Sequence, residues 1–261
     1  MPETAGTRTI LDGVAAIISA SAWPLVTSIA LWGYRKEIRE TSAILVKKLG
    51  SADQIKVGPI EIASRVIESA ISSVPVVQEK NSVPEVQLEA GKELEIKVRA
   101  SGVDEAQSLI AVGREIRELA RKYERNRAAS ASSDLRTWEM DKVVAQMRTL
   151  GRLAVPLLTE LAYSPYPGER LAAIAILQVH PDHDYVPWLE SRMDKEVPFV
   201  FFHAALALRQ YVVEGNIADI RSTRGALQRA VNTVQSLDKD RPHQNTVNVL
   251  KDALEILDET H

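Results

Sequence analysis

The spacing of hydrophobic positions divides the chain into an uncharged N-terminal run, a mixed middle and a helical C-terminal part. Gly13 to Tyr34 holds 22 residues without a charged side chain. At about 1.5 Å of rise per residue, this run can cross the roughly 30 Å hydrocarbon core of a bilayer as one helix. Five basic residues follow it within 35–48 and one precedes it, which predicts a cytoplasmic C-terminal side. We therefore predict a tail at 1–12 and a transmembrane helix at 13–34.

Two other interpretations of the uncharged run stay open, namely a membrane-associated hairpin and a helix buried in a protein core. Pro24 lies in the middle of the run and predicts a kink, because proline removes one backbone donor. A bilayer helix tolerates such a kink. A cleaved signal peptide is disfavoured, because the tail is not basic and apolar residues continue past Ala20-Ser21-Ala22.

Residues 35–103 are predicted to form a juxtamembrane helix, a linker and a small β-hairpin. Helical spacing continues after the uncharged run, and Val74 to Pro84 has two prolines around a polar middle, typical of a linker. Leu94, Ile96 and Val98 then alternate with charged residues, which is the period of a strand. With Ala90-Gly91 as its turn, this pattern predicts a hairpin over 85–99. Two strands alone are marginal in water, so the hairpin needs a packing partner.

A long helix is predicted to start at Asp104, a residue type that favours the N-cap. Its apolar positions from Leu109 to Tyr123 step by three and four residues, which predicts packing into the following domain, with self-association as the alternative. Four arginines share one face of this helix and form a candidate phosphate-binding or interaction surface, although interleaved glutamates favour a merely solvated face. These arginines are Arg114, Arg117, Arg121 and Arg125.

The C-terminal part contains an internal repeat with a period of 31 residues. Val155-Pro156 is related by this offset to Val186-Pro187, and Pro167 to Pro198. A fixed period of this size is typical of a helical solenoid, in which neighbouring helix pairs stack to bury their apolar faces. Each unit is predicted to be helix, loop, helix, and the flanking helices are expected to act as caps. The predicted helices are 153–163 and 169–179 in the first unit, 185–193 and 198–212 in the second, with 136–150, 217–237 and 246–257 flanking them.

The segment 169–208 resembles a short HEAT repeat of about 30 residues. The features that match are Val-Pro-x-Leu in the first helix, an alanine-rich second helix and the acidic Asp194 in the turn. This resemblance implies an α-solenoid that binds other macromolecules on a concave face, without catalysis. The arrangement of an uncharged run, a basic helix and the sequence KVGPIEI is similar to that of many small membrane-anchored bacterial proteins. That second resemblance implies a bacterial inner-membrane protein.

Composition and local motifs indicate binding more than catalysis. The chain has 261 residues, a net charge of −3 and no cysteine, which excludes disulfides, cysteine zinc sites and thiol catalysis and gives no global attraction to nucleic acid. His180, Asp182, His183 and Asp184 could bind a divalent metal, but breaker and cap residues are also expected in a loop between helices. Aromatic residues open the second repeat helix and are further candidates for interaction, although core packing is the favoured alternative. These candidates are Phe199, Phe201, Phe202 and the adjacent His203.

The resulting prediction is a mainly α-helical protein with an N-terminal transmembrane helix, a small β-hairpin and a HEAT-like α-solenoid at 104–261. We expect a single-pass protein of the bacterial inner membrane, with its N-terminus outside and its solenoid in the cytoplasm. Its predicted function is a scaffold or adaptor that contacts a protein partner and the lipid bilayer, with no enzyme activity, cofactor, metal or nucleic acid. The alternative is a membrane-acting regulatory or effector component of a bacterial signalling or defence system that works as a homo-oligomer.

Overall fold

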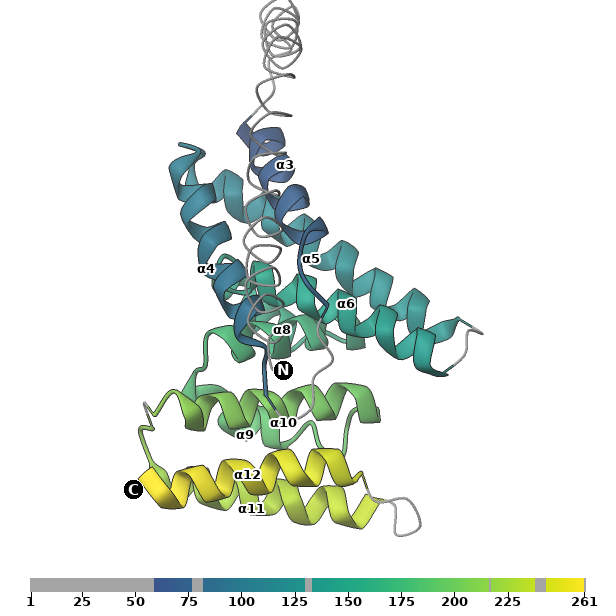
Figure 1. The fold of residues 1–261 in the computed structure, drawn as a ribbon, viewed down its shortest axis with the longest axis vertical. Helices are drawn as coiled ribbons and strands as arrows, with labels where there is room; N and C mark the ends of the chain where they lie inside the picture. The colour runs from purple at the N-terminus through teal and green to yellow at the C-terminus, as the bar shows by residue number, and fades with distance from the viewer. Residues whose placement is uncertain (1–58, 77–81, 130–132, 216, 238–242, 261) are drawn as a thin grey trace, which may run out of the picture. The chain divides into compact units, whose positions relative to one another are not determined.

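The described part of the chain is built from α-helices. The computed structural model describes residues 59–76, 82–129, 133–215, 217–237 and 243–260. These residues form ten α-helices and two short 3-10 helices, and no strand occurs among them (Figure 1). The elements are α3 (Pro59–Ser72), α4 (Glu85–Ala100), α5 (Glu105–Ala128), α6 (Ser133–Gly151), η1 (Val155–Leu157), α7 (Leu158–Ala162), α8 (Pro167–Val179), η2 (His183–Tyr185), α9 (Val186–Glu190), α10 (Pro198–Val213), α11 (Ile220–Leu237) and α12 (Gln244–Thr260).

Successive helices pack as pairs, and the pairs stack. The pairs are α3 with α4, α5 with α6, α7 with α8, α9 with α10, and α11 with α12. The second helices form one row, because α4 packs on α6, α6 on α8, α8 on α10 and α10 on α12. Among the first helices, α3 packs on α5 and α9 on α11. Figure 1 shows α10, α12 and α11 side by side at the C-terminal end of this stack. This arrangement is compatible with an α-solenoid.

The two repeat units fold in the way that their sequence relation predicts. In each unit the first helix is short and begins as a 3-10 turn, η1 before α7 and η2 before α9. Each second helix begins with a proline, Pro167 or Pro198. Proline is tolerated there because the first backbone N–H groups of a helix have no hydrogen-bond partner within the helix. Residues 171–179 of α8 are buried on every side, and small alanines within this stretch let neighbouring helices approach. The predicted repeat helices are thereby confirmed.

The long helix predicted from Asp104 is confirmed as α5. The Asp104 carboxylate accepts a hydrogen bond of 3.1 Å from the backbone N–H of Ala106, as an N-cap does. Val112, Ile116 and Tyr123, which belong to the predicted apolar seam, are buried where α5 packs on α3, α6 and α8. The seam therefore serves packing within this chain, as the first interpretation of it predicted.

The predicted β-hairpin at 85–99 is wrong, because these residues form the helix α4. The buried positions of α4 are Gln87, Gly91, Leu94 and Val98, which recur at steps of four, three and four residues. Ile96, which the strand pattern grouped with Leu94 and Val98, is 67% exposed. Gly91 is not a turn residue: a Cβ atom there would lie 3.5 Å from the carbonyl oxygens of Arg148 and Thr149 in α6. Gly91 thus lies inside the helix, at a buried position where α4 packs on α6.

The predicted fold class also included a transmembrane helix, and the predicted localisation was a single-pass inner-membrane protein. Both predictions are wrong on the structural evidence, because no helix among the described residues is long and apolar enough to cross a membrane. The most apolar described helix, α10, has 16 residues and includes Arg209. Its length of roughly 24 Å falls short of a bilayer core of about 30 Å. The segment 13–34, on which these predictions rested, lies outside the described residues.

A row of buried polar side chains connects four of the second helices. Arg148 of α6 is fully buried and donates hydrogen bonds to the side-chain oxygens of Gln178 in α8, at 2.5 Å, and Gln87 in α4, at 2.7 Å. Its third nitrogen lies 3.2 Å from Nδ1 of His203 in α10. Gln178 in turn donates to the backbone carbonyl of His203 at 2.6 Å. Because buried polar groups need specific partners, this row fixes the register of the stacked helices.

Gly168 allows α8 to begin against the backbone of α5. A Cβ atom at Gly168 would lie 2.9 Å from the carbonyl carbon of Ala120 and closer still to its oxygen. Backbone atoms cannot swing aside, so the two helices would have to separate. We expect Gly168→Ala to lower the free energy of unfolding by about 1–3 kcal/mol, measured by urea denaturation. Gly225→Ala is the control, since its nearest neighbour is a flexible Arg229 side chain. Equal effects of the two changes would contradict this account.

Candidate functional site

Two exposed tyrosines lie on the turn between α7 and α8. We call residues 163–166 the tyrosine turn. Tyr163 is 72% exposed and Tyr166 is 63% exposed, so both side chains are largely open to solvent. Both rings therefore extend from the protein surface on the loop between the two helices of the first repeat unit, three residues apart in the sequence.

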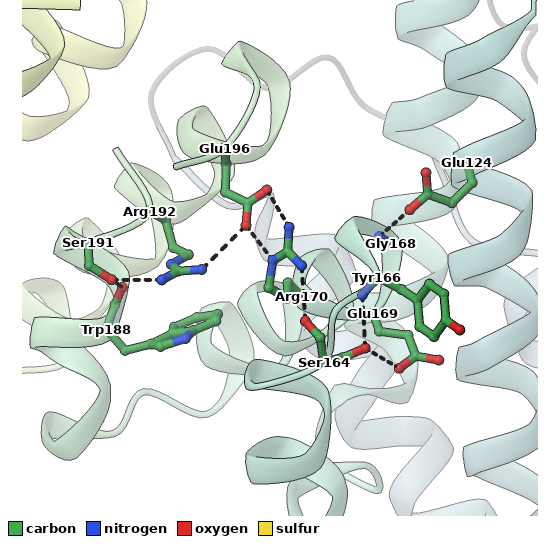
Figure 2. Close-up of polar contacts among 10 residues, drawn as sticks. All are labelled: Glu124, Ser164, Tyr166, Gly168, Glu169, Arg170, Trp188, Ser191, Arg192 and Glu196. Atoms are coloured by element: carbon green, nitrogen blue, oxygen red, sulfur yellow. Dashed lines mark hydrogen bonds and ion pairs between the residues drawn. The ribbon is translucent and has the colours of Figure 1, made fainter. Parts of the chain in front are cut away.

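Hydrogen bonds hold the tyrosine turn in one conformation. The Ser164 hydroxyl donates to the Glu169 carboxylate at 2.7 Å and accepts from the backbone N–H of Tyr166 at 3.1 Å. The Arg170 guanidinium donates to the backbone carbonyl of Ser164 at 3.0 Å. Figure 2 shows Ser164 between Arg170 and Glu169. The turn is thus tied to the first residues of α8.

A buried ion-pair cluster supports the turn from the next repeat unit (Figure 2). The Glu196 carboxylate, 3% exposed, accepts two hydrogen bonds from Arg170, at 2.5 Å and 3.1 Å. Arg192 approaches the same carboxylate at 3.5 Å and stacks over the Trp188 ring at 5.1 Å. Two guanidinium groups therefore share one carboxylate in a site with little water. Removing one member would leave an uncompensated buried charge, which is strongly destabilising.

The end of α5 is attached to the same region. A Glu124 carboxylate oxygen accepts a hydrogen bond of 2.7 Å from the backbone N–H of Gly168, in the first turn of α8. A carboxylate is favourable there because the N-terminus of a helix carries partial positive charge. Burial raises the pKa of the neighbouring Tyr123 to about 12, so its hydroxyl stays protonated at neutral pH. The Tyr123 ring stacks on Phe199, the second residue of α10. The ends of α5, α8 and α10 are thereby held together.

This arrangement has the chemistry of a protein-binding surface. Tyrosine is enriched at protein interfaces because it combines a large apolar ring with a hydroxyl that can hydrogen-bond. Rings on a rigid support lose little conformational freedom when a partner binds. The polar groups beneath the rings, from Ser164 to Glu196, are already paired with one another. They therefore support the turn and do not form a nucleophile-and-base arrangement.

The four arginines predicted as a phosphate-binding surface have separate protein partners. Arg114 donates to the Ser64 hydroxyl of α3, and Arg117 forms an ion pair with Glu160 of α7, each at 2.5 Å. Arg121 and Arg125 both pair with Glu118 of their own helix. Hydrogen bonds from Arg121 and then Arg125 lower the pKa of the exposed Glu118. The structure thus directs these side chains to three different partners, and phosphate binding by them stays a prediction.

The aromatic residues at the start of α10 pack against the core. Phe201 is buried and meets His243 edge-on at 4.9 Å. Phe199 and Phe202 are half-buried, and each lies edge-on to the fully buried His203, at ring distances of 4.6 Å and 5.5 Å. Their contacts fit the alternative interpretation of these residues as core packing.

The predicted metal-binding candidates lie in the loop before α9. Ligand atoms of Asp182, His183 and Asp184 come within 4.8 Å of one another, and His183 and Asp184 are exposed. Asp182 accepts a hydrogen bond of 3.0 Å from the backbone N–H of Asp184 and so caps η2. His180 ends α8 as its C-cap residue. Capping explains why this loop contains these residue types.

The sequence interpretation missed the tyrosine turn and the cluster beneath it. One signal was present: Tyr163 and Tyr166 flank Pro165, and Pro167 follows, between two predicted helices. Tyrosines in a proline-rich connection between helices are expected at the surface, since such connections run over the outside of a domain. The pairing of Arg170 with Glu196, 26 residues apart, had no equivalent signal.

A cavity of about 490 Å³ lies between α4, α5 and the turn after α6. Apolar side chains form much of its wall, including Val98, Leu109 and Leu153, and Arg99 and Arg152 lie among its charged residues. Ser108 also lines the cavity and is only 7% exposed. Its hydroxyl oxygen is buried and has no hydrogen-bond partner within the described part of the chain.

Removing this unpaired hydroxyl is expected to stabilise the fold. A buried polar group without a partner costs about 1–3 kcal/mol, and alanine also favours helix more than serine does. We expect Ser108→Ala to raise the free energy of unfolding by about 1 kcal/mol in urea denaturation. Ser236→Ala, at an exposed position of α11, is the control and should change stability by less than about 0.5 kcal/mol. A destabilised Ser108→Ala protein would show that the hydroxyl has a partner in solution.

Comparisons with known proteins do not assign the chain to a family. No protein-family model, no curated protein and no solved structure matches the sequence or the fold.

Proposed function

We propose that this chain is a helical-repeat scaffold that binds a partner protein through the tyrosine turn and acts by binding instead of catalysis. The observation that carries the proposal is the pair of exposed rings, Tyr163 and Tyr166, on a turn that hydrogen bonds hold in place. A few large aromatic residues commonly supply most of the energy of a protein interface. A rigid turn presents them with a small ordering cost.

The resemblance to short HEAT repeats supports the same function. Both repeat units have the Val-Pro start of the first helix and the alanine-rich second helix on which that resemblance rests. Both also have the same 3-10 entry into a short first helix. We therefore propose that the repeats are of the HEAT type. Stacked helical pairs of this kind provide extended surfaces for macromolecular partners.

The proposal is tested by quantitative affinity purification of the full chain from the cells that produce it, with chemical crosslinking. Wild type is compared with the double variant Tyr163→Ala/Tyr166→Ala. Ile96→Ala is the matched control, because Ile96 is 67% exposed and lies on α4. We expect a protein that is recovered equally with wild type and with the control, and at least about tenfold less with the double variant. Equal recovery with the double variant, or no specific protein with folded wild type, would contradict the proposal.

A further inference from the structure

We propose that the cavity between α4, α5 and the turn after α6 is a binding site for a small amphipathic carboxylate. This site is separate from the tyrosine turn and would provide the scaffold with a small-molecule ligand. Three observations support it: the size and apolar wall of the cavity, the two arginines that line it, and the unpaired hydroxyl of Ser108.

The cavity has the size and wall of a small-molecule site. Its volume of about 490 Å³ lies within the range of roughly 300–1,000 Å³ that is typical of ligand pockets. Val103 and Leu109, with Leu153 and Pro156 after α6, provide an apolar wall whose surface is accessible from the cavity. A hydrocarbon body of about ten carbon atoms can be buried there, and its burial supplies the main driving force for binding.

Two arginines provide the positive charge. Arg152 donates to Glu95 at 2.6 Å and Arg99 donates to the same carboxylate at 2.7 Å. Each guanidinium uses one nitrogen in this way, and its other nitrogens have no partner among the described residues. Glu105 also lines the cavity but belongs to the first turn of α5, where the helix N-terminus favours its charge. A ligand carboxylate would therefore bind on the side of the two arginines, where two positive charges share one negative charge.

The unpaired hydroxyl of Ser108 favours a small ligand over a peptide. Ser108 is 7% exposed and its hydroxyl oxygen is buried without a partner. Rotation of this side chain toward the cavity would allow the hydroxyl to hydrogen-bond to a ligand. Apart from the charged groups, it is the hydrogen-bonding side chain that lines the cavity. A peptide would bring several backbone N–H and C=O groups, and most of them would be buried without partners. A molecule with one charged end and an otherwise apolar body avoids this penalty.

The test is isothermal titration of the full chain with sodium decanoate, and with decanol and decylammonium as probes of the same apolar body. We expect saturable binding of decanoate at one site, and at least about tenfold weaker binding of both other probes.

Ser108→Leu fills the cavity and should abolish decanoate binding, whereas Ser236→Leu on α11 should not. Arg152→Gln should weaken decanoate binding at least about fivefold and leave decanol binding unchanged. Arg229→Gln is its matched control, because Arg229 forms a comparable pair with Glu190 away from the cavity.

Several results would overturn the proposal. These are no saturable binding of decanoate, equal binding of decanoate and decanol, or unchanged binding by Ser108→Leu and Arg152→Gln. If Ser108→Leu does not fold, Arg152→Gln and the comparison of probes decide the outcome. A short apolar peptide that competes with decanoate and binds more tightly would assign the cavity to a protein partner instead. The variant Tyr163→Ala/Tyr166→Ala should bind decanoate as wild type does, which separates this proposal from the proposed function.

Discussion

Replacing Glu196 with glutamine is expected to lower the free energy of unfolding by about 3–5 kcal/mol. The Glu196 carboxylate is 3% exposed and is the shared counterion of Arg170 and Arg192, whose side chains are 16% and 13% exposed. Glutamine keeps the size of the side chain but removes its charge, so two buried guanidinium groups lose their compensating charge. The effect is measured by urea denaturation monitored by circular dichroism.

A matched control for this prediction is Glu190→Gln. Glu190 also accepts two hydrogen bonds from one arginine, Arg229, at 2.9 Å and 2.8 Å. The Arg229 side chain is 60% exposed, however, and exposed ion pairs contribute only about 0–1 kcal/mol. The prediction is therefore a large loss for Glu196→Gln and a small one for Glu190→Gln. Similar small losses for both would show that the buried cluster is hydrated or can rearrange.

Replacing Arg148 with methionine is expected to lower the free energy of unfolding by a similar amount, about 3–5 kcal/mol. Methionine fills much of the space of the arginine chain but cannot donate to Gln87, Gln178 or His203. These groups would lose charged hydrogen-bond donors while staying buried. Because the row connects α4, α6, α8 and α10, we also expect a shallower denaturation curve, measured as a reduced m-value, if the stack no longer unfolds as one unit.

The control for Arg148→Met is Arg224→Met on α11. Arg224 pairs with Asp258 of α12, and both side chains are more than half exposed. Its replacement should change stability by less than about 0.5 kcal/mol. A loss below about 1 kcal/mol for Arg148→Met would contradict the view that the buried polar row fixes the register of the second helices.

The sequence predicted the repeat units well because their signals are local. Prolines mark the starts of α8 and α10, and the 31-residue offset between Val155 and Val186 identifies equivalent positions. The start of a helix can be recognised from its first few residues. A repeat can be recognised by comparing one part of the sequence with another. Both kinds of information can be obtained without knowledge of tertiary contacts.

The features that were missed depend on contacts between distant residues. In α4, Leu94, Ile96 and Val98 have the alternation of a strand, but the structure buries Leu94 and Val98 against neighbouring helices such as α6 and leaves Ile96 exposed. The partners of Arg148 come from residues 30, 55 and 61 positions away in the chain. The cavity that Ser108 lines is likewise formed by residues of α4, α5 and the turn after α6. Periodicity along one segment cannot show which other segment lies against it.

The central claim is that residues from α3 onward form stacked helical pairs, with α4 as the second helix of the first pair. The chain contains no cysteine, so in the double variant Glu95→Cys/Arg152→Cys the two introduced thiols are the only ones. Crosslinking them therefore reports on the distance between positions 95 and 152. The side chains of Glu95 and Arg152 meet at 2.6 Å although 57 residues separate them in the sequence. We predict rapid intramolecular crosslinking of the folded full chain by a short bismaleimide, and its loss in denaturant. Absence of the crosslink in a folded, fully reduced protein would contradict the stack.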